Sequence, residues 1–420
     1  SSGLLLNTGI GGNGTVSIAD NQKLALEADS LTGSGTLTVT GQGALTVNGT
    51  QSAFSSNVNY GAGTLTLSAD NALGTGMLTL TNDTTDMVVS GSQTNTLSFI
   101  GKTLNLASDG TVEWKGNVTG GQLNVTGSAT TLAGPVKLST LTADGIAVQL
   151  TNIGADALNA NDIDSLVSAN GGSISNESVT GKGYYGSYGS LTVTGGSSIT
   201  LHDASVKGAI NAENGAITLE DTAANLGFND ITVSENGELS IDGGTLSTGG
   251  DLTGSGSVAL TDLAAHVGSV DFEGNLGLDN AGITATSDID LTNATLTVST
   301  EGGALTSSEG DMDLGAVTAQ HLKLTANHGV LTFNGATGLT YSMVNVGALD
   351  VEAATTLTNS LLNVAAETLL NASLTLTGTN QPSLGNTLGT IVGGSGTLTL
   401  NNAQVTASGW TATGASLAMN

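Results

Sequence analysis

The fold is decided by the heptapeptide Gly33-Ser34-Gly35-Thr36-Leu37-Thr38-Val39, whose pattern Gly-x-Gly-Thr-Leu-Thr-apolar returns at 61–67 and 394–400. A looser copy lies at 254–260. In each copy two glycines allow the chain to turn, and the residues that follow alternate between polar and apolar side chains. A turn and a short alternation that recur along a chain are typical of a repeating strand unit rather than of a single site.

Short alternations of the same kind run almost from one end of the chain to the other. Each places two apolar side chains on one face of a strand and a Thr, Ser, Asn or Lys on the other, as in a half-buried strand. They occur at 16–18, 45–47, 104–106, 123–125, 191–193, 217–219, 239–241, 296–298, 322–324, 331–333 and 374–376. The sequence therefore predicts an all-β chain.

The spacing of the strands indicates how they pair. After Gly189, glycine-led strands begin again near Gly215, Gly237 and Gly256, a period of roughly 20 residues of the kind that repeat folds show. This interval is too short for a strand with a full crossover helix, but it suits one coil of a right-handed parallel β-helix. About twenty coils at roughly 4.8 Å each predict a β-solenoid on the order of 90 to 100 Å long. The alternative is an antiparallel β-sandwich, whose hairpins would use turns such as Asn48-Gly49.

The repeat is interrupted between 143 and 189. Residues 155–166 are compatible with a short helix, and a Gly/Ser-rich run and a tyrosine cluster follow them. We therefore expect N-terminal solenoid coils at 1–142, an extruded loop or irregular insertion at 143–189, and C-terminal coils at 190–420.

The charge balance excludes several classes of partner. The chain has 35 acidic residues, 7 lysines, no arginine and a net charge of −28, so it would repel nucleic acid and anionic lipid. Only 10% of the residues are charged, which predicts a surface of neutral hydroxyl and amide groups. There is no cysteine for a disulfide framework, and no apolar run of the length that a membrane-spanning helix needs. No signal peptide opens the sequence, which suits a cytosolic protein or the excised mature piece of an exported one.

With these residues in view, the chain resembles the passenger region of a bacterial autotransporter, a type V secreted surface protein. The match is closest at 61–80, which resembles the autotransporter-associated β-strand repeat in its Gly-x-Gly-Thr-Leu-Thr-Leu start and its Ala-Leu-Gly-x-Gly-x-Leu-Thr-Leu end. Residues 288–352 are similar instead to the coils of filamentous-haemagglutinin-like proteins. The resemblance implies a right-handed β-helix, export to the bacterial cell surface or beyond, and a role in adhesion, self-association or biofilm formation. The membrane-embedded barrel that follows such passengers is absent from this sequence.

Tyrosines supply the sharpest candidate for a contact site. Three of the five in the chain fall in 181–189, where glycines flank them. Aromatic faces stack on sugar rings or partner surfaces at low entropic cost, so a recognition loop is one interpretation and a loop folded back over the coil edge is the other. We predict a ligand or partner contact at Lys182, Tyr184, Tyr185 and Tyr188, with Trp114 as a weaker second patch.

Catalytic and metal-binding patterns are not apparent. Carboxylates gather at 220–221, 288–290 and 309–313, where a calcium site and a solvated face are both conceivable, and the solvated face is favoured. The four histidines lack the spacing of a zinc pair, and Gly101-Lys102-Thr103 lacks the earlier glycine of a phosphate-binding loop. We therefore expect no cofactor, no metal and no enzymatic activity.

The predicted function is that of a secreted or surface-exposed adhesin-type solenoid, which binds a second copy of itself or a host or matrix glycan or protein. Two alternatives remain: a carbohydrate-active β-helix enzyme that hydrolyses or cleaves glycans, and a passive stalk. An enzyme would need two carboxylates across a groove, at the separation that glycoside hydrolysis uses.

Overall fold

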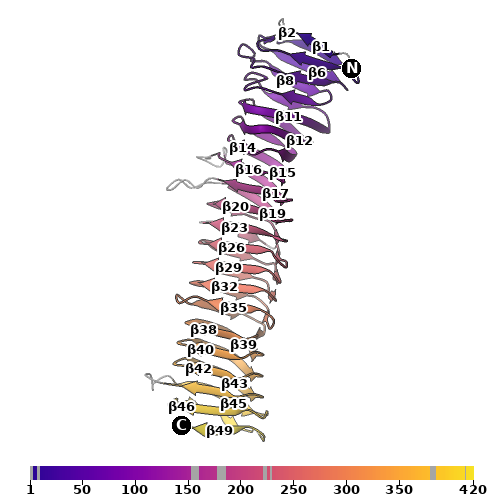
Figure 1. Cartoon of the computed structure of the whole chain (residues 1–420). Coiled ribbons are helices and arrows are strands. Elements are labelled where there is room, and N and C mark those ends of the chain that lie inside the picture. The colour runs from indigo at the N-terminus through magenta and orange to yellow at the C-terminus, as the bar shows by residue number, and fades with distance from the viewer. Residues whose placement is uncertain are drawn as a thin grey trace. The chain divides into compact units, whose positions relative to one another are not determined.

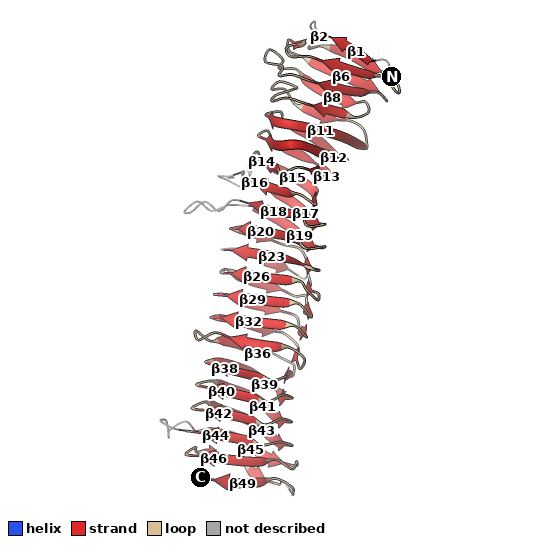
Figure 2. Ribbon diagram, in the orientation of Figure 1, coloured by secondary structure: helices blue, strands red, loops and turns tan. Residues whose placement is uncertain are grey.

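The computed structural model describes residues 3–6, 10–152, 160–176, 186–220, 225–227, 229–378, 385–411 and 413–420. These residues form strands, turns and loops and contain no helix (Figure 2). The chain divides into two compact units, the first comprising Ser1–Gly208 and Gly215–Leu219, the second Ala209–Asn214 and Glu220–Asn420.

The first unit contains the strands up to β21, and β23 (Figure 1). Their bounds are β1 Gly3–Leu6, β2 Ile10–Gly11, β3 Gly14–Ile18, β4 Lys23–Leu26, β5 Leu31–Thr32, β6 Thr36–Gly41, β7 Ala44–Val47, β8 Asn57–Gly61, β9 Leu65–Leu67, β10 Leu78–Leu80, β11 Thr84–Gln93, β12 Leu97–Trp114, β13 Val118–Gly127, β14 Thr130–Leu132, β15 Val136–Asp144, β16 Ala147–Leu150, β17 Asp162–Ala169, β18 Ser173–Asn176, β19 Gly186–Val193, β20 Ser197–His202, β21 Ala204–Val206 and β23 Gly215–Glu220.

The second unit contains β22 and the strands from β24 onward. Their bounds are β22 Ile210–Ala212, β24 Asn225–Gly227, β25 Ile231–Val233, β26 Glu238–Asp242, β27 Thr245–Thr248, β28 Leu252–Gly254, β29 Ser257–Thr261, β30 Ala264–Val267, β31 Val270–Phe272, β32 Asn275–Asp279, β33 Ala281–Ala285, β34 Ile289–Leu291, β35 Thr295–Val298, β36 Gly303–Ser307, β37 Met312–Leu314, β38 Val317–Gln320, β39 Leu322–Phe333, β40 Thr337–Thr340, β41 Met343–Val351, β42 Thr355–Thr358, β43 Leu361–Leu370, β44 Leu374–Thr377, β45 Asn386–Val392, β46 Thr397–Asn401, β47 Val405–Thr406, β48 Gly409–Trp410 and β49 Ser416–Met419.

Each strand pairs in parallel with the strand one coil further along the chain. In the first unit β6 pairs with β8 and β8 with β10, and in the second β29 pairs with β32 and β32 with β35. The prediction of an all-β parallel solenoid of about 20 coils is therefore confirmed. The antiparallel β-sandwich is wrong for the described residues, because the registered strand pairs among them are parallel.

The core of each unit consists of aliphatic side chains stacked from coil to coil. In one column of the first unit, five leucines of consecutive coils are at most 1% exposed and lie in direct register: Leu104, Leu123, Leu141, Leu166 and Leu191. A column of the second unit is equally buried and consists of Ile283, Leu305, Leu324, Val344 and Leu362. Burying each such side chain contributes roughly 1.5–3 kcal/mol, so these columns are a main source of stability.

The leucine column also shows how the region 143–189 is built. Leu123 pairs with Leu141, Leu141 with Leu166 and Leu166 with Leu191, and the last two steps span a longer stretch of sequence than the first. The coils continue in register through this region, and their extra residues fall between β16 and β17 and between β18 and β19.

One expectation for this region needs correction. Asp162–Ala169 is strand β17 and not the end of a helix, because Ile163 and Leu166 pair with Leu138 and Leu141 of the preceding coil. Residues 155–159 lie outside the described residues. The described part of 143–189 contains strands that pair with the neighbouring coils, and the division of the chain at 142 and 189 stays a prediction.

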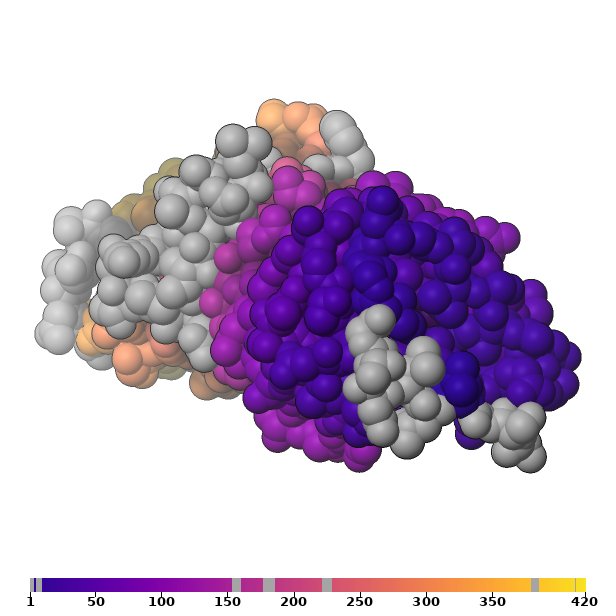
Figure 3. Space-filling model, turned by 90° about the horizontal axis from the view of Figure 1, so that it is seen from above, coloured from indigo at the N-terminus to yellow at the C-terminus, as the bar shows by residue number. Residues whose placement is uncertain are grey.

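Buried amide side chains close the turns inside the first unit. Gln51 is fully buried, where its Nε2 donates to the carbonyls of Glu27 and Gly49 and its Oε1 accepts from the Leu31 amide. Gln93 makes the same three bonds two coils later, to the carbonyls of Ala69 and Ser90 and the Ala72 amide. Each glutamine thus satisfies backbone groups that the turn leaves without strand partners. The N-terminal coils of this unit, indigo in Figure 3, face the viewer in that view.

Candidate functional site

The outward-facing residues form hydrogen-bonded columns between coils. In the first unit Asn124 Nδ2 donates to Asn105 Oδ1 at 2.9 Å, and Asn105 Nδ2 donates to Asp86 Oδ1 at 2.9 Å. We call Asp86, Asn105 and Asn124 the amide column. The three residues occupy the same register position of consecutive coils, and their neighbours in the strand point inward. Amide groups that carry both donors and acceptors are therefore displayed at the coil spacing.

The second unit repeats this arrangement. Asn363 Nδ2 donates to Asn345 Oδ1 at 2.8 Å, and Thr387 Oγ1 donates to Asn363 Oδ1 at 3.4 Å. An open groove of about 530 Å³ follows the column from Thr325 to Thr387. Columns of outward-facing asparagines thus occur in both units.

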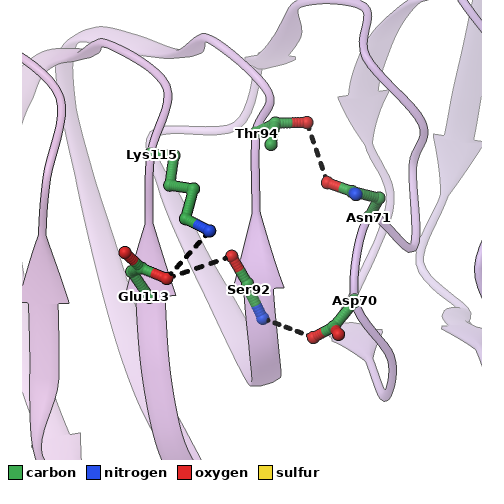
Figure 4. A network of polar contacts seen from close by, with 6 residues as sticks. All are labelled: Asp70, Asn71, Ser92, Thr94, Glu113 and Lys115. Carbon is green, nitrogen blue, oxygen red and sulfur yellow. Dashed lines mark hydrogen bonds and ion pairs between the residues drawn. The ribbon is translucent and has the colours of Figure 1, made fainter.

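A second kind of contact between coils lies at the corner shown in Figure 4. Asp70 Oδ1 accepts the Ser92 amide at 2.7 Å, and Ser92 Oγ contacts Glu113, which forms an ion pair with Lys115 at 3.1 Å. Thr94 Oγ1 donates to Asn71 Oδ1 at 2.8 Å beside it. Three of these four contacts involve the carboxylate of Asp70 or Glu113, so this corner, unlike the amide column, is joined mainly through charged groups.

Two of the predicted contact residues belong to the core. Trp114 is 1% exposed and donates its Nε1–H to the Asn95 carbonyl at 2.7 Å. Tyr188 is also 1% exposed and pairs in register with Ile163. Their burial corrects the expectation of an exposed patch, because neither ring offers surface to a partner. Lys182, Tyr184 and Tyr185 lie outside the described residues, and their role stays a prediction.

Carboxylates of the acidic clusters accept hydrogen bonds from backbone N–H groups at the corners of the coils. Asp288 Oδ1 accepts the Asp311 amide at 2.9 Å, and Asp311 Oδ1 accepts the Val330 amide at 2.8 Å, so each carboxylate binds the backbone of the next coil. No group of three or more His, Asp or Glu side chains that could hold a metal ion is found within the described ranges.

One carboxyl group of the second unit, that of Asp350 in strand β41, has a raised pKa. Partial burial raises the pKa of Asp350, and the negative charges of Glu352, Glu367, Asp313 and Asp311 raise it further. Asp350 in strand β41 therefore lies in an environment that four other carboxylates make negative.

A shallow groove of about 540 Å³ lies on β30, β33 and β36 of the second unit. Its floor is formed by Ala264, Gly282 and Ala304, which are in register on three consecutive coils. The outward residue one coil before them is Thr245 and the one after them is Lys323. The groove exists because three small residues interrupt a column of larger side chains. We call it the Gly282 groove.

One wall of the Gly282 groove carries an aromatic ring. His321 lines the groove and stacks on Tyr341, with ring centroids 5.9 Å apart and an interplanar angle of 21°. Both residues have left-handed backbone angles, φ 54° and 50°, at a corner where Gly302 precedes them by one coil and where Asn280 and Asn359 occupy the coils on either side of these three. Asparagine tolerates this conformation well, whereas a bulky side chain such as tyrosine rarely adopts it. The corner thus holds an aromatic pair where the fold itself favours asparagine.

Sequence reasoning missed this pair. His321 and Tyr341 are separated by the length of one coil, and that spacing is the signal that could have found them. The tyrosine cluster at 184–188 drew attention instead, because it is contiguous.

No protein-family model, no curated protein and no solved structure matches this chain. Within the described residues, no helix has the length and apolar character that crossing a bilayer requires. The class of protein that the structure defines is therefore a parallel β-solenoid with neutral polar columns on its surface.

Proposed function

We propose that the chain is a non-catalytic adhesion or self-association module that works outside the cell or on a bacterial surface. The amide column carries this proposal, because Asn105 and Asn124 present neutral donors and acceptors at the coil spacing to any matching surface, next to the carboxylate of Asp86. A second copy of the chain has the same spacing, and so it can pair its own column with this one.

The energetics favour many weak contacts over a single strong one. A neutral hydrogen bond contributes about 0.5–1.5 kcal/mol net, and a column that spans several coils adds such contacts into avidity. The net charge of −28 opposes the approach of two copies, so contact must occur where the surface is neutral. The solenoid fold is compatible with the resemblance to autotransporter passengers, which supports an exported, surface-exposed setting.

A carbohydrate-active enzyme is the second candidate. The Gly282 groove has Asp262 and Glu301 on its rim, two coils apart, and two carboxylates beside a groove are what glycoside hydrolysis requires. Release of sugar from a bound glycan would distinguish this function from adhesion.

Sedimentation velocity over a wide range of protein concentration tests the proposal. The variant Asn105→Asp/Asn124→Asp converts the amide column into three stacked carboxylates, which repel an identical column. We expect it to associate much more weakly than the wild-type chain. The neutral variant Asn105→Ala/Asn124→Ala removes the hydrogen bonds without adding charge and should weaken association to a smaller extent.

The matched control is Thr79→Asp/Thr119→Asp, which adds the same charge on a different outward column of the same coils. It should associate like the wild-type chain, with circular dichroism verifying that each variant is folded. Equal loss of association in both charged variants would show that net charge alone matters and would overturn the proposal.

A further inference from the structure

We propose that the Gly282 groove binds a neutral glycan chain, with the imidazole of His321 as the surface on which a sugar ring stacks. This inference concerns a different surface from the amide column. It rests on the proposed function only in that the chain must meet glycans outside the cell.

The stacking surface follows from the aromatic pair. Tyr341 stacks on one face of the His321 imidazole, and the residue at the same corner one coil earlier is Gly302, which also lines the groove and has no side chain to place against the ring. A side chain at Gly302 would begin 3.1 Å from His321 Cβ, so the absence of one leaves space beside His321 in the groove. An aromatic face in such a position can pack against the C–H groups of a pyranose ring.

The phenol of Tyr341 holds the imidazole in place. His321 Nδ1 also lies 3.1 Å from the Thr300 carbonyl, so the ring is fixed by a polar contact at its edge and by the stacked phenol on its far face. A pre-positioned ring loses little conformational entropy on binding.

The rim of the groove suits the hydroxyl groups of a sugar. Asn280 Nδ2 donates to Asp262 Oδ1 at 2.7 Å, and Glu301 and Lys323 border the same groove. Carboxylate oxygens accept hydrogen bonds while the Lys323 ammonium donates them, and a sugar hydroxyl can do both. Because the floor consists of Ala264, Gly282 and Ala304, a ring can approach the strands closely.

Charge selects against acidic glycans. Two carboxylates and one ammonium border the groove, and the whole chain carries a net charge of −28. A sulfated or uronic-acid chain would be repelled at long range, whereas a neutral hexose or N-acetylhexosamine chain would not. The ligand class is therefore a neutral oligosaccharide.

Isothermal titration of the full chain tests this inference, with neutral tetrasaccharides of glucose, mannose and N-acetylglucosamine as probes and a heparin oligosaccharide as the acidic comparison. We expect at least one neutral tetrasaccharide to bind with a dissociation constant of about 1 mM or tighter. Its binding should shift the NMR signals of the His321 ring. The heparin oligosaccharide should not bind.

Two variants locate the site without endangering the fold. His321→Asn installs the residue found at this corner two coils before and two coils after, Asn280 and Asn359, and Gly282→Thr/Ala304→Thr fills the floor with side chains that strands favour. A Cβ at Gly282 would meet only ordinary contacts, the nearest to Ala304 at 3.4 Å. Both variants should bind the tetrasaccharide at least about ten-fold more weakly.

The matched control is His328→Asn, because His328 is also exposed and its Nδ1 also lies 3.1 Å from a carbonyl, that of Ser308, away from the groove. It should bind like the wild-type chain. The inference is overturned if no neutral tetrasaccharide binds, if only heparin binds, or if binding survives in both groove variants. Self-association should be unchanged in the groove variants, so failure here is distinguishable from failure of the proposed function. Shortened sugar products would support the groove as a glycan site and contradict the non-catalytic role.

Discussion

Trp114 shows how strand alternation decides the role of a single side chain. Val112 and Trp114 point inward and Glu113 points outward, so a large aromatic residue on this parity enters the core. The indole N–H would be costly to bury alone, and the Asn95 carbonyl one coil earlier accepts it. Trp114, predicted from the sequence as a weaker contact patch, is therefore a structural residue of the core.

Replacing this residue gives the first prediction. Trp114→Ala should lower the free energy of unfolding of the first unit by about 3–5 kcal/mol, because it empties a core position. Trp410 is 40% exposed in the second unit, and Trp410→Ala should change that unit's stability by only about 0.5 kcal/mol. Urea unfolding followed by circular dichroism measures both, and similar values for the two variants would contradict the placement of Trp114.

Asp350 gives a pH-dependent prediction. Its pKa is raised in the folded state by burial and by four neighbouring carboxylates, so the folded chain holds this proton more tightly than the unfolded chain. The proton on Asp350 stabilises the folded state at pH values below the pKa that Asp350 has in the unfolded chain. This stabilisation is lost as the pH rises through the higher pKa that Asp350 has in the folded chain. Asp350→Asn should therefore stabilise the second unit at neutral pH by about 0.5 kcal/mol.

The advantage of Asp350→Asn should shrink as pH falls through the raised pKa. Urea unfolding at a series of pH values measures it, with Asp242→Asn, an exposed carboxyl of the same unit, as the control. An advantage that is constant with pH, or equal in the control, would exclude the proposed cause.

At the scale of one residue, the sequence predicts whether a side chain points into the core or outward. It predicts less well which outward side chains a ligand can reach. The alternation at Leu65, Thr66 and Leu67 correctly predicts buried, half-buried and buried positions, and the same parity applied to Trp114 would have placed it inside. His321 and Tyr341 could not be paired from sequence, because their contact depends on the register between coils.

At the scale of strands and turns, buried glutamines determine how a coil closes. Gln51 and Gln93 fill equivalent places and make equivalent hydrogen bonds, although the residues around them differ. An amide side chain supplies two donors and an acceptor, which matches two carbonyls and one N–H that the turn directs inward. The turn conformation thus depends on the side chain that it encloses.

Removing one of these amides should destabilise the first unit. Gln93→Ala leaves the carbonyls of Ala69 and Ser90 and the Ala72 amide without this partner, at a cost of about 2 kcal/mol. The exposed Gln122 serves as the control, and Gln122→Ala should cost no more than about 0.5 kcal/mol. Equal midpoints of urea unfolding for the two variants would refute the closing role of Gln93.

Strand identity was predictable at this scale, but strand register was not. Alternation at 104–106 and 123–125 predicts two strands, and the structure pairs them residue by residue. The coil length varies even along one leucine column, being greater from Leu141 to Leu166 than from Leu123 to Leu141, while the leucines themselves stay in register. A regular interval therefore predicts the solenoid but does not predict which outward residues form a column.

At the scale of the whole molecule, composition bears on the proposed function through strand register. A chain with 10% charged residues and a net charge of −28 repels a second copy, so the proposed self-association requires contact at neutral columns. Parallel coils keep donors and acceptors at one spacing, which a second copy shares.

The most direct test asks which surface of the first unit faces a second copy. The chain has no cysteine, so single cysteines report contacts between copies without interference. Thr126→Cys lies beside the amide column on β13 and leaves it intact, whereas Thr119→Cys lies on a different outward column of the same strand. Under mild oxidation at concentrations where the wild-type chain associates, we predict that Thr126→Cys forms disulfide-linked dimers and Thr119→Cys does not. Faster dimer formation by Thr119→Cys, or none by either variant while association persists, would contradict the account.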